Sequence, residues 1–77
     1  MQLGDKGQDW MEGLFALYTD AQSLSTSWQQ EFVESFWSRV ENFGANVFVS
    51  KKQLEQLNKI ADIYGWHNLN EKDLDQN

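Results

Sequence analysis

The strongest constraint on the fold is a helical repeat of apolar residues between positions 27 and 43. Their successive steps are 4, 1, 3, 1, 3 and 3, and they are Trp28, Phe32, Val33, Phe36, Trp37, Val40 and Phe43. This spacing places them on one stripe of an α-helix, whereas a half-buried strand would require strict alternation. Thr26 and Gln29 form a capping-box pattern before the stretch, and Gly44 follows it. These end signals predict a helix over 27–43.

A second helix is predicted over residues 50–64. Ser50 and Gln53 have capping-box spacing, Gly65 is suited to the helix end, and the apolar stripe comprises Leu54, Leu57, Ile60, Ala61 and Tyr64. Residues 44–49 read GANVFV. Since Val and Phe favour extended backbone, this connection is expected to be an apolar linker that fills part of the core.

A further helix is predicted over residues 9–22, beginning at an Asp9–Glu12 capping box. Its apolar residues form a wide stripe made of Trp10, Met11, Leu14, Phe15, Leu17, Tyr18 and Ala21. Residues 1–8 contain two Gly and no apolar repeat, so we expect a loose lead-in, and residues 67–77 should be a mobile tail. The predicted fold is all-α, a compact three-helix bundle in a single domain spanning residues 1–77.

Residue composition excludes several ways of stabilising or using so small a domain. There is no Cys, which excludes disulfides and thiolate metal sites. Stability must then come from helix caps, a partner or buried aromatic residues, and Trp28, Phe32, Phe36 and Trp37 are expected in the core.

Few residues could carry chemistry, and we identify no catalytic, cofactor-binding or metal-binding residue. His67 is the one His, and it lies outside any metal-binding spacing. Ser and Thr residues of 23–27 have no His base nearby and are better explained as turn and cap residues. The chain is therefore expected not to be an enzyme and to use no cofactor.

A formal net charge of −6 argues against a nucleic-acid partner and against an anionic membrane surface. Glu31, Glu34 and Glu41 form an acidic row on the helix over 27–43. The row is either a solvated face or a contact for a protein partner with a basic surface. No stretch is apolar enough to span a membrane, and no signal peptide is evident, so a cytoplasmic location is expected.

Apolar residues on the helix over 9–22 exceed what one contact face needs. Trp10, Met11 and Phe15 are accordingly predicted to bind a partner. A homodimer through this helix is one form that such binding could take.

One motif pair resembles a known hairpin. Trp28-x-x-x-Phe32-Val33-x-Ser35 and the later Val49-Ser50-x-Lys52-Gln53-x-x-x-Leu57-x-x-Ile60 resemble a short helical hairpin of phage replication- and recombination-associated proteins. In that family the pattern runs roughly Trp-Glu-x-x-Phe-Ile-x-Ser, then Leu-Thr-x-Lys-Gln. The resemblance covers residues 26–63, with Gln29 in place of the family's Glu and a longer, more apolar connection over 44–49. It implies a small phage-encoded protein near nucleic-acid machinery, and it implies no catalytic residue.

Two functions remain open from the sequence. The first is a small acidic phage-type binding protein that inhibits or redirects a host nucleic-acid-processing or defence complex, as an anti-CRISPR-like inhibitor would. The alternative is an accessory module of phage replication or recombination that contacts single-stranded DNA through aromatic residues and Lys51, Lys52 and Lys59.

Overall fold

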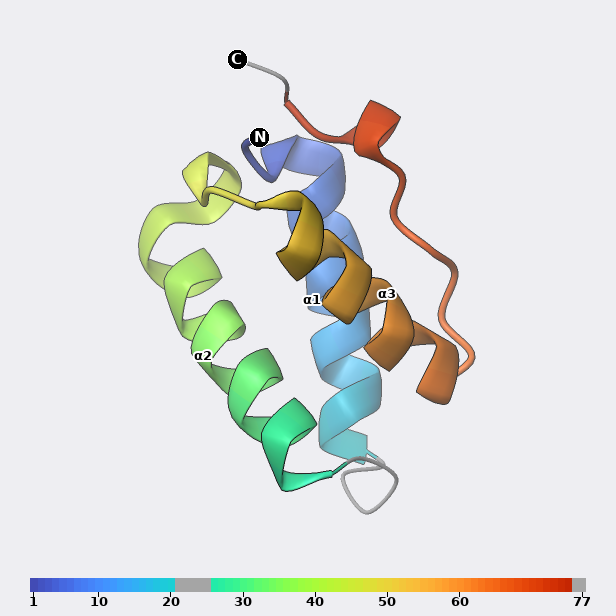
Figure 1. Ribbon diagram of the computed structural model, residues 1–77. Coiled ribbons are helices and arrows are strands. Elements are labelled where there is room, and N and C mark those ends of the chain that lie inside the picture. The colour runs from blue at the N-terminus through green and yellow to red at the C-terminus, as the bar shows by residue number, and fades with distance from the viewer. Residues whose placement is uncertain (21–25, 76–77) are drawn as a thin grey trace.

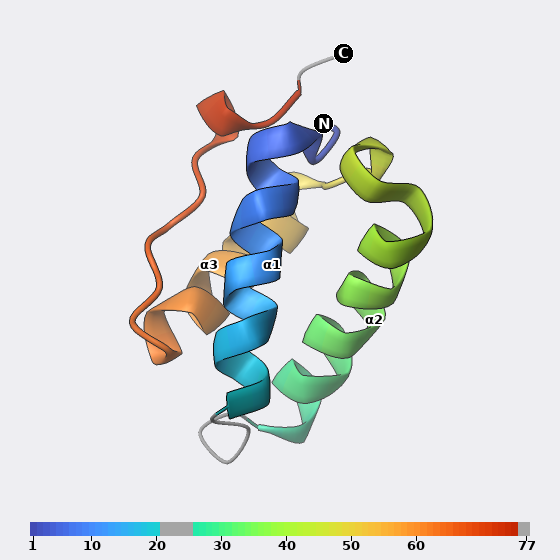
Figure 2. The ribbon, with the colours of Figure 1, turned by 180° about the vertical axis from the view of Figure 1, so that it is seen from behind.

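The computed structural model describes residues 1–20 and 26–75 and consists of three α-helices with two short 3-10 turns (Figure 1). The elements in chain order are α1 (Gly4–Asp20), α2 (Ser27–Phe43), η2 (Gly44–Asn46), α3 (Lys51–Ile63) and η3 (Glu71–Asp73). The predicted all-α, three-helix fold is confirmed. Seen from behind, α1 lies between α2 on one side and α3 with the C-terminal segment on the other (Figure 2).

The starts of α2 and α3 follow the predicted capping boxes. The Thr26 hydroxyl accepts from the Gln29 backbone N–H at 3.2 Å, and the Gln29 side chain accepts from the Thr26 N–H at 3.1 Å. Ser50 and Gln53 make the same two bonds at 3.1 and 2.9 Å. These bonds satisfy backbone N–H groups that the first helical turn leaves unpaired, so the boundaries follow from local sequence.

Gly44 and Gly65 end α2 and α3 as predicted. Their φ angles are 57° and 70°, in the range that side-chain-bearing residues rarely adopt. Val47 and Val49 of the connection are buried, whereas Phe48 between them is 60% exposed. The linker therefore fills the core with alternate residues, as extended backbone dictates, and directs its aromatic ring outward.

Residues 1–8 differ from the prediction of a loose lead-in. Helix α1 begins at Gly4, so the proposed Asp9 cap is wrong, and Asp9 is an exposed residue within the helix. Leu3 is fully buried, and its N–H donates to the Val47 carbonyl at 2.8 Å. Leu3 and Val47 are more than 40 positions apart, so a local sequence pattern cannot predict this contact.

The C-terminal segment also differs, because residues 67–75 are packed rather than mobile. Leu69 and Leu74 are 3% and 5% exposed. Gln2 and Asp75 exchange backbone hydrogen bonds at 2.8 and 2.9 Å, which ties the two ends of the chain together. Leu69 is further held by the Asn58 side chain, through bonds of 2.8 and 3.0 Å. The predicted mobile tail is wrong for this segment; residues 76–77 lie outside the described residues, as do residues 21–25 of the predicted first turn.

One core cluster joins all three helices, the connection and both ends of the chain. Phe36 and Val40 of α2 are buried in it together with Leu54, Leu57 and Ile60 of α3, as their periods predict. Phe32 and Trp37 are only partly buried, and Trp28 is 55% exposed, so the expectation that all four α2 aromatics are core residues is wrong for Trp28.

Candidate partner-binding face

The predicted partner-binding residues of α1 are mostly core residues. Trp10 is 4% exposed and Met11 is fully buried, so neither can contact a partner in this structure, and that prediction is wrong for both. Phe15 is partly buried and stacks on Trp37 of α2, with ring centroids 4.8 Å apart and an interplanar angle of 10°. The reason for expecting a homodimer through α1 is thereby removed, because α2 and the packed C-terminal segment use its apolar residues.

Two indole rings fix the C-terminal segment on α1. Trp10 Nε1 donates to the His67 carbonyl at 2.6 Å, and Trp66 Nε1 donates to the Trp10 carbonyl at 3.1 Å. A Cβ at Gly13 would lie 2.4 Å from the Trp66 ring, so the absence of a side chain there creates the space that the ring occupies. Gly7 gives similar room to Leu3 and Leu74. These contacts cover part of the wide apolar stripe of α1, whose members within residues 10–18 are all buried or partly buried.

The acidic row lies where the sequence places it, on the outside of α2. Glu31, Glu34 and Glu41 are all exposed. Glu34 also accepts a short hydrogen bond from the Tyr18 hydroxyl of α1. Burial of the Tyr18 phenol, together with this bond and the Glu34 charge, raises the pKa of Tyr18 to about 12. Glu34 thus has a structural contact, while Glu31 and Glu41 extend into solvent on the same face.

Three aromatic residues outside the predicted partner-binding set are the most exposed large apolar side chains of the described residues. Trp28, Phe43 and Phe48 are 55%, 62% and 60% exposed. Trp28 is in the first turn of α2 and Phe43 is its last residue, about 22 Å away at the rise of an α-helix. Phe48 is joined to α2 because the Arg39 guanidinium donates to its carbonyl at 3.2 Å.

We call the exposed residues of α2 the α2 outer face, which comprises Ser27, Trp28, Glu31, Glu34, Ser35, Ser38, Glu41, Asn42 and Phe43. It presents three carboxylates along the helix, with an exposed aromatic ring near each end of α2. The sequence contains a pattern from which this exposed face could be predicted. The apolar stripe of α2 is too wide for one contact, and the buried residues Val33, Phe36 and Val40 occupy only its centre. Trp28 and Phe43 lie at its ends.

A hollow of about 350 Å³ lies on this face and is lined by Trp28, Glu31, Phe32 and Ser35. These positions are i, i+3, i+4 and i+7, which brings them onto one patch of the helix. The Trp28 and Phe32 ring centroids are 5.9 Å apart, and Phe32 in turn contacts the buried Phe36 ring at 6.2 Å. The hollow therefore has an aromatic wall connected to the core and a carboxylate on its rim.

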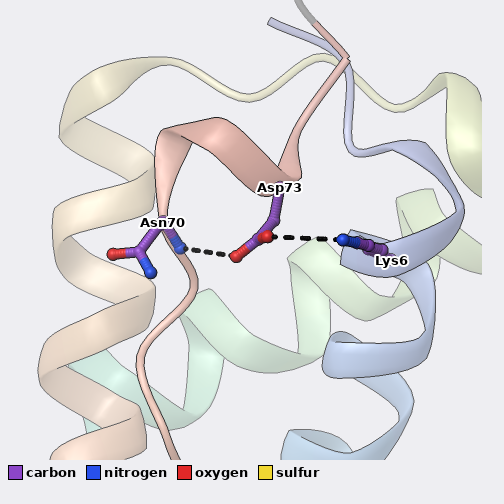
Figure 3. A network of polar contacts seen from close by, with 3 residues as sticks. All are labelled: Lys6, Asn70 and Asp73. Atoms are coloured by element: carbon purple, nitrogen blue, oxygen red, sulfur yellow. Dashed lines mark hydrogen bonds and ion pairs between the residues drawn. The ribbon is translucent and has the colours of Figure 1, made fainter.

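A second hollow, of about 270 Å³, lies between α1 and the C-terminal segment. Its lining consists of Lys6, Asp9, Trp10, His67, Asn68, Leu69 and Asp73. Lys6 Nζ lies 3.9 Å from Asp73 Oδ1, and the Asn70 N–H donates to Asp73 Oδ2 at 3.3 Å (Figure 3). The Lys6–Asp73 ion pair thus crosses the seam beside this hollow, whereas the Asn70–Asp73 bond lies within the C-terminal segment.

Within residues 1–20 and 26–75, no group of three or more His, Asp and Glu side chains is arranged to hold a metal ion. No helix in the same ranges has the length and apolar content needed to cross a membrane. Comparisons of the chain with protein-family models, with curated proteins and with solved structures found no match.

Proposed function

We propose that this protein is a non-enzymatic binding protein that docks the α2 outer face on a basic surface of another protein. The observation that carries the proposal is the exposure of Glu31 and Glu41 on the helix that also exposes Trp28 and Phe43. Trp side chains are common binding hot spots, and charges around them set orientation and association rate. The helix that displays them is capped and packed on the core, so little ordering would be needed on binding.

Basic protein surfaces are characteristic of complexes that bind nucleic acid, because they must neutralise phosphates. An acidic chain of this size could inhibit such a complex by occupying the nucleic-acid channel or by blocking access to it. We therefore propose a host nucleic-acid-processing or defence complex as the partner, with the cytoplasm as the site of action. The phage setting of this proposal comes from the hairpin resemblance of residues 26–63 alone.

The residues available also support a binding role over a catalytic one. With one His and no Cys, the chain has few ways to build an activated nucleophile. The His67 side chain is exposed, and the hydrogen bond that this residue makes with Trp10 uses its backbone carbonyl.

Two charge-reversal variants of equal net charge test the proposal. Glu31→Lys/Glu41→Lys changes the α2 outer face, and Glu12→Lys/Glu55→Lys changes exposed acids of α1 and α3 as the matched control. Glu34 is left unchanged because it binds Tyr18. Each protein is used to capture partners from a bacterial lysate, the captured protein is identified, and its association and dissociation rates are measured with the purified pair.

The α2 variant should lose the partner while the control retains it. The association rate should fall more than the dissociation rate rises, with the largest effect at low salt, since exposed charges are screened over about 8–10 Å at physiological ionic strength. Equal losses in both variants would mean that net charge alone governs capture. Undiminished capture by both would contradict docking through α2.

The single-stranded DNA alternative has one observation in its favour. Phe48 is exposed just before α3, close in sequence to the exposed Lys51 and Lys52, and stacking aromatics beside cations are typical of single-strand binders. Lys51 Nζ, however, lies 3.9 Å from a Glu71 carboxylate oxygen. Under this alternative the Glu31/Glu41 reversal should strengthen binding to oligothymidine, and Lys51, Lys52 and Lys59 changed to Glu should abolish it.

A further inference from the structure

We propose that the hollow formed by Trp28, Glu31, Phe32 and Ser35 receives an arginine side chain of the partner protein. The inference rests on the proposed function and deepens it, because it names the group that the α2 outer face recognises. Its basis is the combination of an exposed indole, an exposed carboxylate and a hydroxyl around one hollow of about 350 Å³.

The aromatic wall suits a flat cation. Trp28 is 55% exposed, so more than half of its surface is open to a ligand. The Phe32 ring centroid lies 5.9 Å from that of Trp28 and 6.2 Å from that of the core residue Phe36, so a chain of ring contacts connects the indole to the core. Cations bind over aromatic faces within about 6 Å of the ring centroid, with Trp the strongest of the aromatic residues.

The carboxylate selects the charge of the ligand. Glu31 lies three residues after Trp28 and four before Ser35, so its side chain extends from the same patch of α2. The hollow's lining contains no cation that would neutralise Glu31, and the whole chain has a net charge of −6. An apolar ligand group would desolvate this carboxylate without compensation, whereas a cation would pair with it.

Arginine fits better than lysine because of its geometry. A guanidinium is planar and carries five N–H donors in a fixed fork, so it can stack on the indole while donating to a carboxylate and a hydroxyl at its edge. An ammonium group is a compact charge without a flat face. The chain's own arginine, Arg39, follows Ser35 by four residues but does not line the hollow. Its guanidinium lies over the Phe36 ring and donates to the Phe48 carbonyl.

The test follows the indole N–H signal of Trp28 in the ¹⁵N-labelled full chain during addition of Nα-acetyl-arginine amide. The lysine derivative and the neutral citrulline derivative serve as ligand controls. Glu31→Gln removes the charge from the hollow, and Glu41→Gln removes an equivalent exposed charge farther along the same face. Both sites are exposed, so both variants should fold normally, which their remaining indole signals will verify.

Arginine should shift the Trp28 signal, and it should bind about three-fold or more tightly than citrulline or lysine. Glu31→Gln should weaken arginine binding by a similar factor, while Glu41→Gln should leave it unchanged. An absent Trp28 response, equal binding of arginine and citrulline or of arginine and lysine, or equal effects of the two variants would overturn the proposal. A Trp28 shift that depends on protein concentration alone and disappears in Arg39→Gln would assign the hollow to a second copy instead.

Failure of this inference and failure of the proposed function can be told apart. If arginine binds in the hollow but the Glu31→Lys/Glu41→Lys variant captures its partner normally, the hollow stands and docking through α2 fails. If that variant loses its partner, but citrulline binds as tightly as arginine and Glu31→Gln does not weaken arginine binding, docking through α2 stands and the arginine site is overturned.

Discussion

The seam between α1 and the C-terminal segment and the α2 outer face both contain tryptophan, yet they use it differently. In the seam, Trp10 is 4% exposed, and the indole N–H groups of Trp10 and Trp66 each donate to a backbone carbonyl across the contact. On the outer face, Trp28 is 55% exposed and lines a hollow with a carboxylate. A buried indole needs a partner for its N–H, and the seam supplies one. The contrast separates aromatics that fold the chain from those available for binding.

Replacing one tryptophan from each region should give the largest difference in the free energy of unfolding between two variants. Trp10→Ala should lower the free energy of unfolding by about 3–5 kcal/mol, because it leaves a cavity in the core. Trp28→Ala should change it by less than about 0.5 kcal/mol, as for other surface residues. Chemical denaturation of both variants measures the difference. Comparable losses would mean that Trp28 supports the fold and that the two regions are not distinct.

Gly13 offers a sharper test of the seam. Alanine is a better helix former than glycine by about 1 kcal/mol, so Gly13→Ala would stabilise a helix with open space at that position. Here the new Cβ would lie 2.4 Å from the Trp66 ring, and overpacking of this kind costs about 1–3 kcal/mol. We expect a net destabilisation in thermal and chemical unfolding.

A second background supplies the control for this substitution. In a Trp66→Ala chain the ring is absent, so the same Gly13→Ala change should become stabilising by up to about 1 kcal/mol. The change of sign identifies the clash as its cause. Identical effects in both backgrounds would show that Trp66 does not occupy the space beside Gly13.

Asn58 tests whether the C-terminal segment is integral to the fold. Its side chain exchanges two hydrogen bonds with the backbone of Leu69, which is buried. Asn58→Ala should cost about 1–3 kcal/mol, because it leaves backbone groups of that residue unpaired. Asn42→Ala, at an exposed position on the α2 outer face, is the matched control and should be nearly neutral. Amide exchange near Leu69 should accelerate in the Asn58 variant only, and unchanged protection there would contradict the role of Asn58.

The Tyr18–Glu34 bond joins the two regions and predicts a pH dependence. Burial raises the pKa of Tyr18 from 10.0 to about 12, with the Glu34 bond contributing, so folding favours the protonated phenol. This stabilisation is present in full below pH 10.0 and is lost as the pH rises toward 12. The difference in unfolding free energy between wild type and Tyr18→Phe should therefore shrink across that interval. A difference that stays constant or grows would contradict the assignment.

Local signals in the sequence predict much of the helical framework. The capping boxes at Thr26 and Ser50 and the glycines after α2 and α3 are all confirmed, because each acts within a few residues. The ends of the chain could not be predicted in this way. Their fixed positions depend on backbone hydrogen bonds between Gln2 and Asp75, residues that are far apart in the sequence.

The error at the candidate site has the same origin. In the sequence, Gly13 indicates only a weakened helix. The structure shows that its missing side chain leaves room for the Trp66 ring of the C-terminal segment. Without that segment in place, the sequence favours Trp10 and Met11 as exposed anchors. Glu31 and Glu41 were placed correctly because exposure on α2 follows from helical period alone.

Chemical-shift mapping with a hexa-arginine peptide tests most directly whether the α2 outer face is the binding surface. The measurement follows backbone amide and indole signals of the full chain at low salt, where weak ionic contacts are least screened. The account predicts that the largest shifts concentrate on Trp28, Glu31, Ser35, Ser38 and Glu41, with the Trp10 and Trp66 indoles unchanged. Shifts spread over all exposed acids, or centred on the hollow around Asp9 and Asp73, would contradict it.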